Sequence, residues 1–376
     1  MFRGNQRGIY LLGAALLCTL AFCVSPTFAE EIAAENGPLV EMTGVNQWYL
    51  DTYNFKENDF PAVMAQFMAE NHLSERNFSM SYEISDGSLH YDFAENEFRA
   101  AASTYKLPLN MYYYDLERNG EISSTANIRG YALDYAHRQS IVYSNNDVSD
   151  AMFLNLGSFR HYRELMAQYY DQEYPEIFYK KNRINSAYMV AILKRIYENS
   201  ANYTELIGYM KEANPGQYFK ANEEPYEVAH KYGSYEGAVN DVGIIYTEVP
   251  YYLAVYTQGV ANTGALLGRL AALTTEYTNY HIWMQKETAA QEALAAEKAE
   301  AARLAAEEER KVIVAAQVAK HDAEMKNIYI RYAICLGIVL LWLVALFVAL
   351  SVYLFKRHDK KSFMKYMKYY SVPMQN

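Results

Sequence analysis

Ser103-Thr104-Tyr105-Lys106 is the stretch of sequence from which most of the fold and the chemistry can be inferred. An isolated serine hydroxyl is a weak nucleophile and needs an adjacent base. A helix beginning near Ala101 would bring the Lys106 amine beside the Ser103 hydroxyl, because residues three apart share a helix face. Apolar neighbours would help the lysine to lose its proton. The Ser103 amide, at the helix start, would help to bind an oxyanion.

A second motif, Ser144-Asn145-Asn146, precedes a helical pattern that starts near Asp150. A hydroxyl at this place would relay a proton between Lys106 and a leaving nitrogen, and the Asn146 amide would bind a substrate amide. The alternative is a simple capping turn, because Ser, Asn and Asp are all favourable at helix starts.

A third motif, Lys231-Tyr232-Gly233-Ser234, leads into a predicted pair of strands. A lysine and a hydroxyl here would bind a substrate carboxylate, and Gly233 would let the substrate backbone approach closely. The amide of Ser234 would be a second oxyanion donor. The alternative is an ordinary strand start with an exposed lysine.

In this order the three motifs resemble the S-x-x-K, S-D-N and K-T-G signature of class A β-lactamases and penicillin-binding serine hydrolases. The resemblance extends over about residues 60–280. It implies that Ser103 is the nucleophile, that Lys106 and Ser144 transfer protons, and that no cofactor is needed. It implies an oxyanion hole built from the backbone amides of Ser103 and Ser234. The substrate-binding residues that it implies are Asn146, Lys231, Gly233 and Ser234.

The chain departs from this family at three places. Asn145 stands where the family has Asp, and Tyr232 stands where it has Thr or Ser, whose hydroxyl role would pass to Ser234. In the family, a glutamate on an Ω-loop between the second and third motifs activates the water that releases the acyl-enzyme. No E-x-x-L-N sequence occurs in that interval. The nearest counterparts are Glu173 and Glu176, for which surface acids on a divergent loop are the alternative.

Strand and helix patterns predict an α+β domain at residues 48–284, after a polar lead-in at residues 30–47. Strand patterns at residues 78–84, 89–93, 242–246 and 251–255 flank a middle part with helical spacing, so the sheet must be assembled from distant segments. Further helices are predicted at residues 60–71, 186–197 and 266–280. The resemblance implies a β-lactamase/transpeptidase-like fold: an antiparallel sheet with helices on both faces and a helical subdomain.

Both ends of the chain resemble targeting segments. Residues 1–29 read as a signal peptide, in which Arg3 and Arg7 precede an apolar run and Ala29 ends the cleavage site; an uncleaved anchor is the alternative. Residues 332–355 carry no charge and are long enough for one transmembrane helix. The tail at residues 356–376 is basic, which places it in the cytoplasm and the domain outside the membrane.

Residues 285–331 are rich in Ala, Glu, Lys and Arg and contain neither Gly nor Pro. Opposite charges at helical spacing, such as Glu300–Arg303 and Glu307–Lys311, predict a helix. Sustained apolar heptads are absent from the sequence, so a solvated helical stalk is favoured over a coiled coil.

The charge and the cysteines exclude several classes of partner. The chain carries −10 in total, the tail +5 and the signal +2, so the part between them carries −17. Such an acidic domain argues against nucleic acid as a partner. All three cysteines lie in the signal or in the predicted membrane span, and the histidines lack metal-ligand spacing, so no metal is expected.

The sequence therefore predicts a single-pass cell-membrane serine hydrolase with an extracytoplasmic domain, which forms an acyl-enzyme with β-lactams or D-alanyl peptides. Hydrolysis of the β-lactam amide is the first interpretation. A peptidoglycan D,D-peptidase or penicillin-binding protein with slow deacylation is the second, and an inactive wall-binding module is the third. The presence of Ser103, Lys106, Ser144 and Lys231 argues against the third. The sequence leaves the oligomeric state open.

Overall fold

The computed structural model describes residues 37–222 and 226–369. The signal peptide predicted at residues 1–29 lies outside the described residues, as does the beginning of the lead-in. The chain divides into a globular unit, Ala29–Glu292, and a second unit that includes residues 293–369. Each unit is described by itself.

The globular unit is built on a five-stranded antiparallel sheet with the order β2-β1-β9-β8-β7. Its strands come from both ends of the unit: β1 Phe78–Ile84, β2 His90–Phe93, β7 Glu227–Tyr235, β8 Ala238–Tyr246 and β9 Tyr251–Thr257. Strand β1 pairs with β9, so that Tyr82 lies opposite Leu253. The hairpin between β7 and β8 closes through Glu236 and Gly237, which both have positive φ as a two-residue turn requires.

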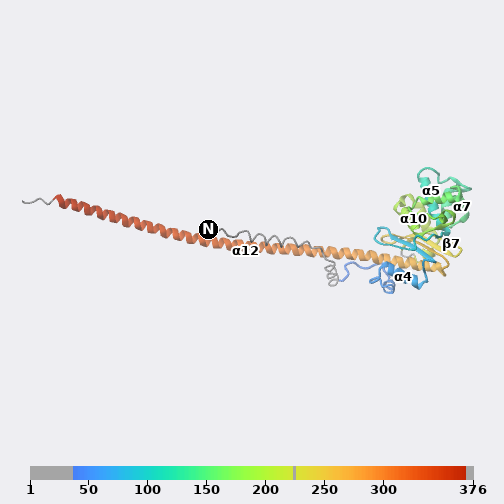
Figure 1. The fold of residues 1–376 in the computed structure, drawn as a ribbon, viewed down its shortest axis with the longest axis horizontal. Coiled ribbons are helices and arrows are strands. Elements are labelled where there is room, and N and C mark those ends of the chain that lie inside the picture. Colours follow the sequence, from blue (N-terminus) through green and yellow to red (C-terminus); the bar gives the residue numbers. More distant parts are fainter. Residues whose placement is uncertain (1–36, 223–225, 370–376) are drawn as a thin grey trace, which may run out of the picture. The chain divides into compact units, whose positions relative to one another are not determined.

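Both faces of the sheet are buried, which strand β9 shows most clearly. Its side chains at positions 251, 253 and 255 belong to one hydrophobic core, and those at 252, 254 and 256 belong to the other. This alternation follows from the two-residue period of a strand. A sheet buried on both faces must have helices on both sides (Figure 1).

One face of the sheet packs against α4 (Phe60–Glu70) and the first turns of α12 (Thr263–Tyr369), with α3 (Gln47–Thr52) in the same core. The other face packs against α10 (Ser186–Glu198) and the remaining helices. These are α5 Lys106–Arg118, α6 Leu133–Ile141, α7 Asn146–Asn155, α8 Phe159–Ala167, α9 Glu176–Lys180 and α11 Thr204–Glu212. An antiparallel sheet with helices on both faces is thus confirmed as the fold class.

Short elements complete the helical part. Two small antiparallel pairs are β3 (Arg99–Ala100) with β6 (Arg183–Ile184), and β4 (Asn127–Ile128) with β5 (Tyr131–Ala132). Three 3-10 turns are η1 Ala102–Tyr105, η2 Ser200–Asn202 and η3 Tyr218–Asn222. Turn η1 carries Ser103 and follows β3 directly.

The described part of the polar lead-in is fastened to α12. The amides of Leu39 and Val40 donate to the Glu287 carboxylate, at 2.9 and 2.8 Å from Oε2. The indole of Trp283 donates to the Val40 carbonyl at 2.9 Å, and Asn279 donates to the Gly44 carbonyl at 2.7 Å. The lead-in is therefore part of the globular unit.

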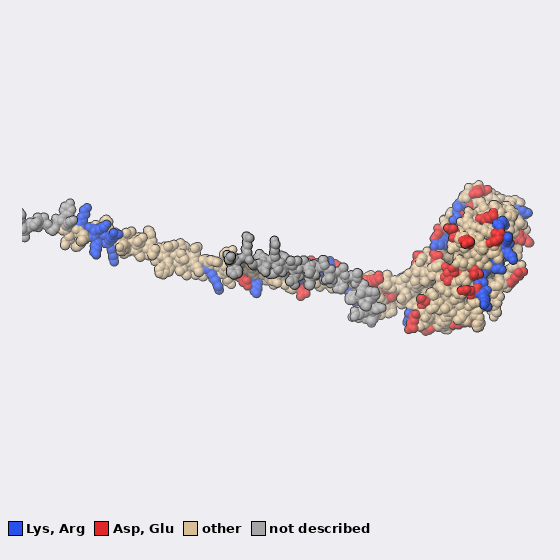
Figure 2. All heavy atoms as spheres, viewed as in Figure 1, with Lys and Arg blue, Asp and Glu red and all other residues tan. Residues whose placement is uncertain are grey.

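Helix α12 continues into the second unit. It is long enough and apolar enough to cross a membrane, with mean hydropathy 3.0 over its most apolar 18-residue window. Residues 332–355 include no acidic or basic residue, and Figure 2 shows a cluster of basic residues farther along α12. This is consistent with the single spanning helix predicted at residues 332–355. In the stretch before it, Arg303 pairs with Glu300 at 2.7 Å and Lys311 pairs with Glu307 at 3.2 Å.

Candidate active site

Ser103 lies in η1, in the chain between β3 and α5. The sequence predicted an α-helix from Ala101 onward; the structure has a 3-10 turn first and an α-helix only from Lys106. In a 3-10 turn the side chains at positions i and i+3 eclipse, so Ser103 and Lys106 lie on the same side. Ser103 is partly exposed, Lys106 is fully buried, and the Ser103 hydroxyl makes no hydrogen bond within the described residues.

The turn around Ser103 is held by polar contacts from two segments. Asn182 accepts from the Ala101 amide through its carbonyl and donates through its side chain to the Ala102 carbonyl, both at 2.9 Å. The side chain of Asn240, on β8, donates to the Ala100 carbonyl at 2.7 Å. These contacts hold Ala102 at φ 46°, a strained conformation for a residue with a side chain.

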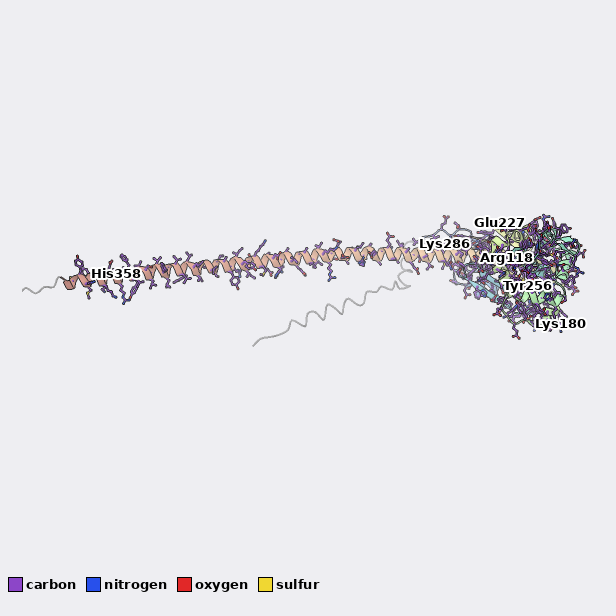
Figure 3. The ribbon with its side chains drawn as sticks, turned by 90° about the horizontal axis from the view of Figure 1, so that it is seen from above. Arg118, Lys180, Glu227, Tyr256, Lys286 and His358 are labelled. Carbon is purple, nitrogen blue, oxygen red and sulfur yellow. The ribbon has the colours of Figure 1, made fainter. Side chains whose placement is uncertain are left out.

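The residue after Ser103 is also fixed. Thr104 is buried, and its hydroxyl donates to the Ala101 carbonyl at 2.8 Å and lies 3.1 Å from the hydroxyl of Tyr256. Tyr256 is labelled in Figure 3. The turn is thereby connected to strand β9, and its backbone is preorganised before any substrate arrives.

The ammonium of Lys106 contacts the second motif. Nζ donates to the Ser144 carbonyl at 2.6 Å and to Asn146 Oδ1 at 2.8 Å, and lies 3.3 Å from Ser144 Oγ. Burial lowers the pKa of Lys106 to about 8, against the opposing effect of the Asp150 carboxylate. A lysine with this pKa is partly neutral near pH 8 and can act as a general base.

Asp150 is a residue that the sequence analysis did not assign to the site. It follows Asn146 by four positions on α7, so the two side chains lie on one helix face. Its carboxylate also accepts a long hydrogen bond of 3.5 Å from the Tyr105 hydroxyl. The four-residue spacing from Asn146 is the signal in the sequence that would have indicated it.

The second motif is both a capping turn and a contact for Lys106. Asn145 is the N-cap of α7, and its side chain accepts from the Val148 amide at 3.2 Å. Asn and Asp are equally good in this position, so the departure from Asp has no structural cost here. Ser144 takes φ 54°, which directs the residues on either side of the cap toward Lys106.

The third motif lies within strand β7, rather than before a strand as the sequence predicted. Lys231 is fully buried, and its Nζ donates to Ser144 Oγ at 3.1 Å and to the Tyr232 carbonyl at 2.8 Å. The Ser144 hydroxyl therefore lies between two lysine ammonium groups. Burial, and secondly the charge of Lys106, hold the pKa of Lys231 well below its usual value.

Gly233 allows β7 to approach the turn that carries Ser103. A Cβ at this position would lie 2.5 Å from the Ser103 amide nitrogen and 3.1 Å from that of Thr104. Both are backbone atoms that cannot move aside, so any larger residue would push the strand and the turn apart. Ser234, which is exposed, follows Gly233 in β7.

Next to the motif, His230 is buried in β7 with both ring nitrogens engaged. Nδ1 lies 2.8 Å from Asp241 Oδ2, and Nε2 lies 2.9 Å from the Ala213 carbonyl oxygen. These contacts are structural.

Glu173 and Glu176 are surface residues. Both are exposed, and Glu176 forms ion pairs with Arg160 and with Lys180, the latter at 3.3 Å. The hydrogen bond from Arg160 lowers the pKa of Glu176. Within the described residues, neither glutamate makes a hydrogen bond or ion pair with a motif residue.

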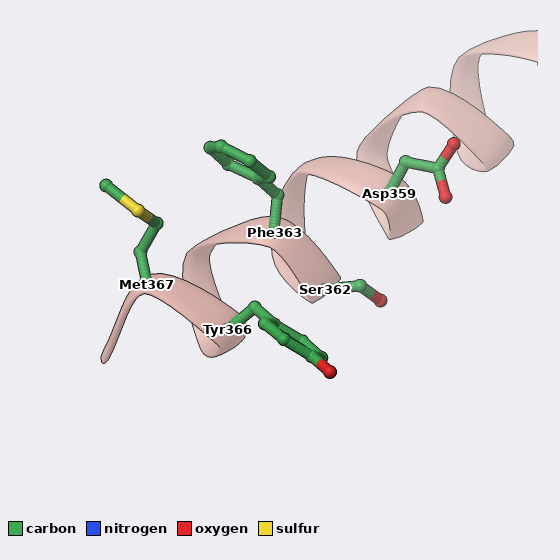
Figure 4. Close-up of a pocket in the computed structure, with 5 residues that line it drawn as sticks. All are labelled: Asp359, Ser362, Phe363, Tyr366 and Met367. Carbon is green, nitrogen blue, oxygen red and sulfur yellow. The ribbon is translucent and has the colours of Figure 1, made fainter. Parts of the chain in front are cut away.

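A metal site and a separate hollow were the other candidates for a functional site among the described residues. No group of three His, Cys, Asp or Glu side chains could hold a metal ion in the part of the chain that the structure describes. A hollow of about 620 Å³ is formed by Asp359, Ser362, Phe363, Tyr366 and Met367 (Figure 4). All five belong to one helix, so the hollow has a single wall and contains no motif residue.

Comparison with known proteins shows what the fold and part of the sequence resemble. Residues 139–278 match the model of the β-lactamase enzyme family, a range that includes the second and third motifs and begins after Ser103. A β-lactamase from Sphaerobacter thermophilus is 17% identical with a TM-score of 0.51, and the match covers 59% of this chain and 99% of that one. One from Chitinophaga pinensis is 17% identical with a TM-score of 0.50, covering 59% and 100%.

The penicillin-binding protein PBP-A is 13% identical with a TM-score of 0.51, and the match covers 60% of this chain and 98% of that one. A variant of PBP-A, with a TM-score of 0.50, forms an acyl-enzyme complex with penicillin G. None of the curated protein sequences compared with this chain matches it. At these identities the structural likeness concerns the fold. Together with the family match, it confirms the resemblance that the three motifs indicated.

The pKa of Lys106 leads to a test by pH. Only the neutral amine accepts a proton, so the rate constant of Ser103 acylation should rise with pH and level off above about 8. Asp150 raises this pKa, so Asp150→Asn should move the midpoint to lower pH. Asp147→Asn, an exposed acid on the same helix, is the control and should leave the midpoint in place. A midpoint that Asp150→Asn moves upward or does not move would contradict this assignment.

Proposed function

We propose that this chain, which has the fold of β-lactamases and penicillin-binding proteins, is a membrane-anchored serine hydrolase that forms an acyl-enzyme through Ser103. One observation carries the proposal. The Ser144 hydroxyl lies 3.3 Å from the Lys106 ammonium and 3.1 Å from that of Lys231, beside a turn that places Ser103 and Lys106 on one side. This is the arrangement that proton transfer to and from a serine nucleophile requires.

In the proposed reaction, neutral Lys106 accepts the proton of the Ser103 hydroxyl as Oγ bonds to the carbonyl carbon of an amide. The oxyanion of the tetrahedral intermediate accepts hydrogen bonds from the amides of Ser103 and Ser234. Gly233, next to Ser234, lets β7 approach the Ser103 amide. Ser144 passes a proton to the leaving nitrogen as the C–N bond breaks, and Lys106 replaces that proton. Asn146 orients the substrate, and Lys231 orients the Ser144 hydroxyl.

The proposed substrates are β-lactams or D-alanyl peptides of peptidoglycan. A β-lactamase is the first candidate. A D,D-peptidase or penicillin-binding protein with slow deacylation is the second, and the exposed positions of Glu173 and Glu176 favour it. An inactive wall-binding module is the third. The mutual contacts of Lys106, Ser144 and Lys231 argue against it, because a binding module has no need of two buried lysines at one hydroxyl.

Labelling with a penicillin tests the acyl-enzyme. Full-length protein in detergent should gain one penicillin mass at Ser103, because the neighbouring lysine activates this hydroxyl. Ser103→Ala should abolish the adduct in intact-mass spectra, and Ser123→Ala, at an exposed surface serine, should retain it. An adduct that persists in Ser103→Ala would remove the nucleophile from the proposal.

Turnover separates the first two candidates. Without a glutamate at the site, release of the acyl group lacks a base, which typically costs about 10²–10⁴ in rate. We expect a burst of product equal to the enzyme concentration, followed by a slow steady rate. Glu173→Gln and Glu176→Gln should change that steady rate little. Fast turnover that either substitution stops at the acyl-enzyme would favour the β-lactamase.

The proposed topology places the globular unit outside the cell and the basic tail in the cytoplasm. Protease added to intact cells should then remove the globular unit and leave the tail protected. An epitope placed after Asn376 should become accessible to antibody only after the membrane is permeabilised. An epitope that is accessible on intact cells would reverse the orientation.

A further inference from the structure

An aromatic ring covers the ammonium of Lys231. This nitrogen lies 4.0 Å from the centre of the Tyr232 ring, and two of its three N–H groups already donate to Ser144 Oγ and the Tyr232 carbonyl. The lysine side chain has no exposed surface. The protein therefore satisfies the ammonium by itself, through two hydrogen bonds and one cation–π contact. A substrate carboxylate has no free donor to reach at this position.

The covering ring is held in place from behind. The ring of Tyr218 stacks on that of Tyr232, with centroids 5.4 Å apart and an interplanar angle of 14°. Tyr218 takes φ 54° at the start of η3, and the next residue, Phe219, donates its amide to Asp241 at 3.0 Å. Asp241 is the buried partner of His230, so the position of Tyr218 is anchored in the core of the sheet.

The residue type at position 232 matters for substrate binding. In the family that this chain resembles, the position of residue 232 is occupied by Thr or Ser. The resemblance implies that this small hydroxyl binds the substrate carboxylate together with the lysine at position 231. Here that hydroxyl is replaced by a half-buried ring over the lysine.

We propose that Tyr232, backed by Tyr218, determines specificity by closing Lys231 to anions, so that the site accepts acyl donors without a carboxylate beside the scissile bond. These donors are D-alanyl esters, thioesters or amides with an uncharged leaving group. The inference rests on the proposed acylation of Ser103. A penicillin still acylates Ser103, but its carboxylate adds little to the rate.

A matched pair of donors tests the proposal. One is an N-acyl-D-alanyl thioester of thioglycolate, which carries a carboxylate, and the other is the same compound as its methyl ester. For the full-length protein we expect kcat/KM for the acid to be no higher than that for the ester. Tyr232→Thr uncovers Lys231 and restores a hydroxyl, so the acid-to-ester ratio should rise about 10- to 100-fold, the usual effect of a charge-assisted hydrogen bond.

Two further variants separate the ring from its hydroxyl. Tyr232→Phe keeps the ring over Lys231 and should keep the wild-type ratio of acid to ester. Tyr218→Ala removes the stacking partner and should raise the ratio in the same direction as Tyr232→Thr, by a smaller factor. It provides the same test if Tyr232→Thr does not fold.

The outcomes distinguish the two proposals. A wild-type protein that prefers the acid tenfold or more, or a ratio that neither Tyr232→Thr nor Tyr218→Ala raises, overturns the specificity proposal and leaves the acyl-enzyme intact. Absence of any adduct at Ser103 with both donors, in the wild type and in folded variants, overturns the proposed function itself.

Discussion

Two lysine ammonium groups share one serine hydroxyl in the interior of this protein, and the arrangement of the site depends on that contact. Lys106 and Lys231 come from different parts of the fold, α5 and β7, and meet at Ser144 Oγ. Burial lowers the pKa of both amines, and the charge of Lys106 lowers that of Lys231 further. The two buried amines donate hydrogen bonds to the Ser144 and Tyr232 carbonyl oxygens and to Asn146. These bonds offset part of the free-energy cost of burying the two charges.

The sheet makes this meeting possible, because it brings together segments that are far apart in the sequence. The small strand before Ser103 is fixed by Asn182 and by Asn240, and β7 approaches the turn where Gly233 leaves room for the Ser103 amide. Strained backbone occurs at Ala102, the residue before Ser103, and at Ser144 itself. Strained backbone of this kind persists only where the surrounding structure over-determines it.

Much of the fold could be predicted from local patterns, whereas the details of the site depend on tertiary contacts. The hairpin at residues 78–93 and the apolar segment of α12 have periodicity or composition that determines them locally. Strand β7 is buried on both faces, so it lacks the alternation by which a strand is recognised, and the third motif was expected before it. The spacing of Ser103 and Lys106 puts both on one side of the 3-10 turn. The position of the Tyr232 ring over Lys231 was not predictable from the sequence. It depends on stacking with Tyr218, which is a tertiary contact.

The hydrogen bonds between the lead-in and α12 affect the order in which the chain can fold during synthesis. Leu39 and Val40 bond to Glu287, a separation of 248 and 247 residues, and β1 pairs with β9 near the end of the unit. Contacts at such separation cannot form until the last partner has emerged, and topologies rich in them fold slowly. The helical middle of the chain can collapse early, but the sheet and the lead-in must wait. Completion of the globular unit therefore coincides with emergence of the helix that carries the apolar segment, so the domain becomes complete only as its anchor is being made.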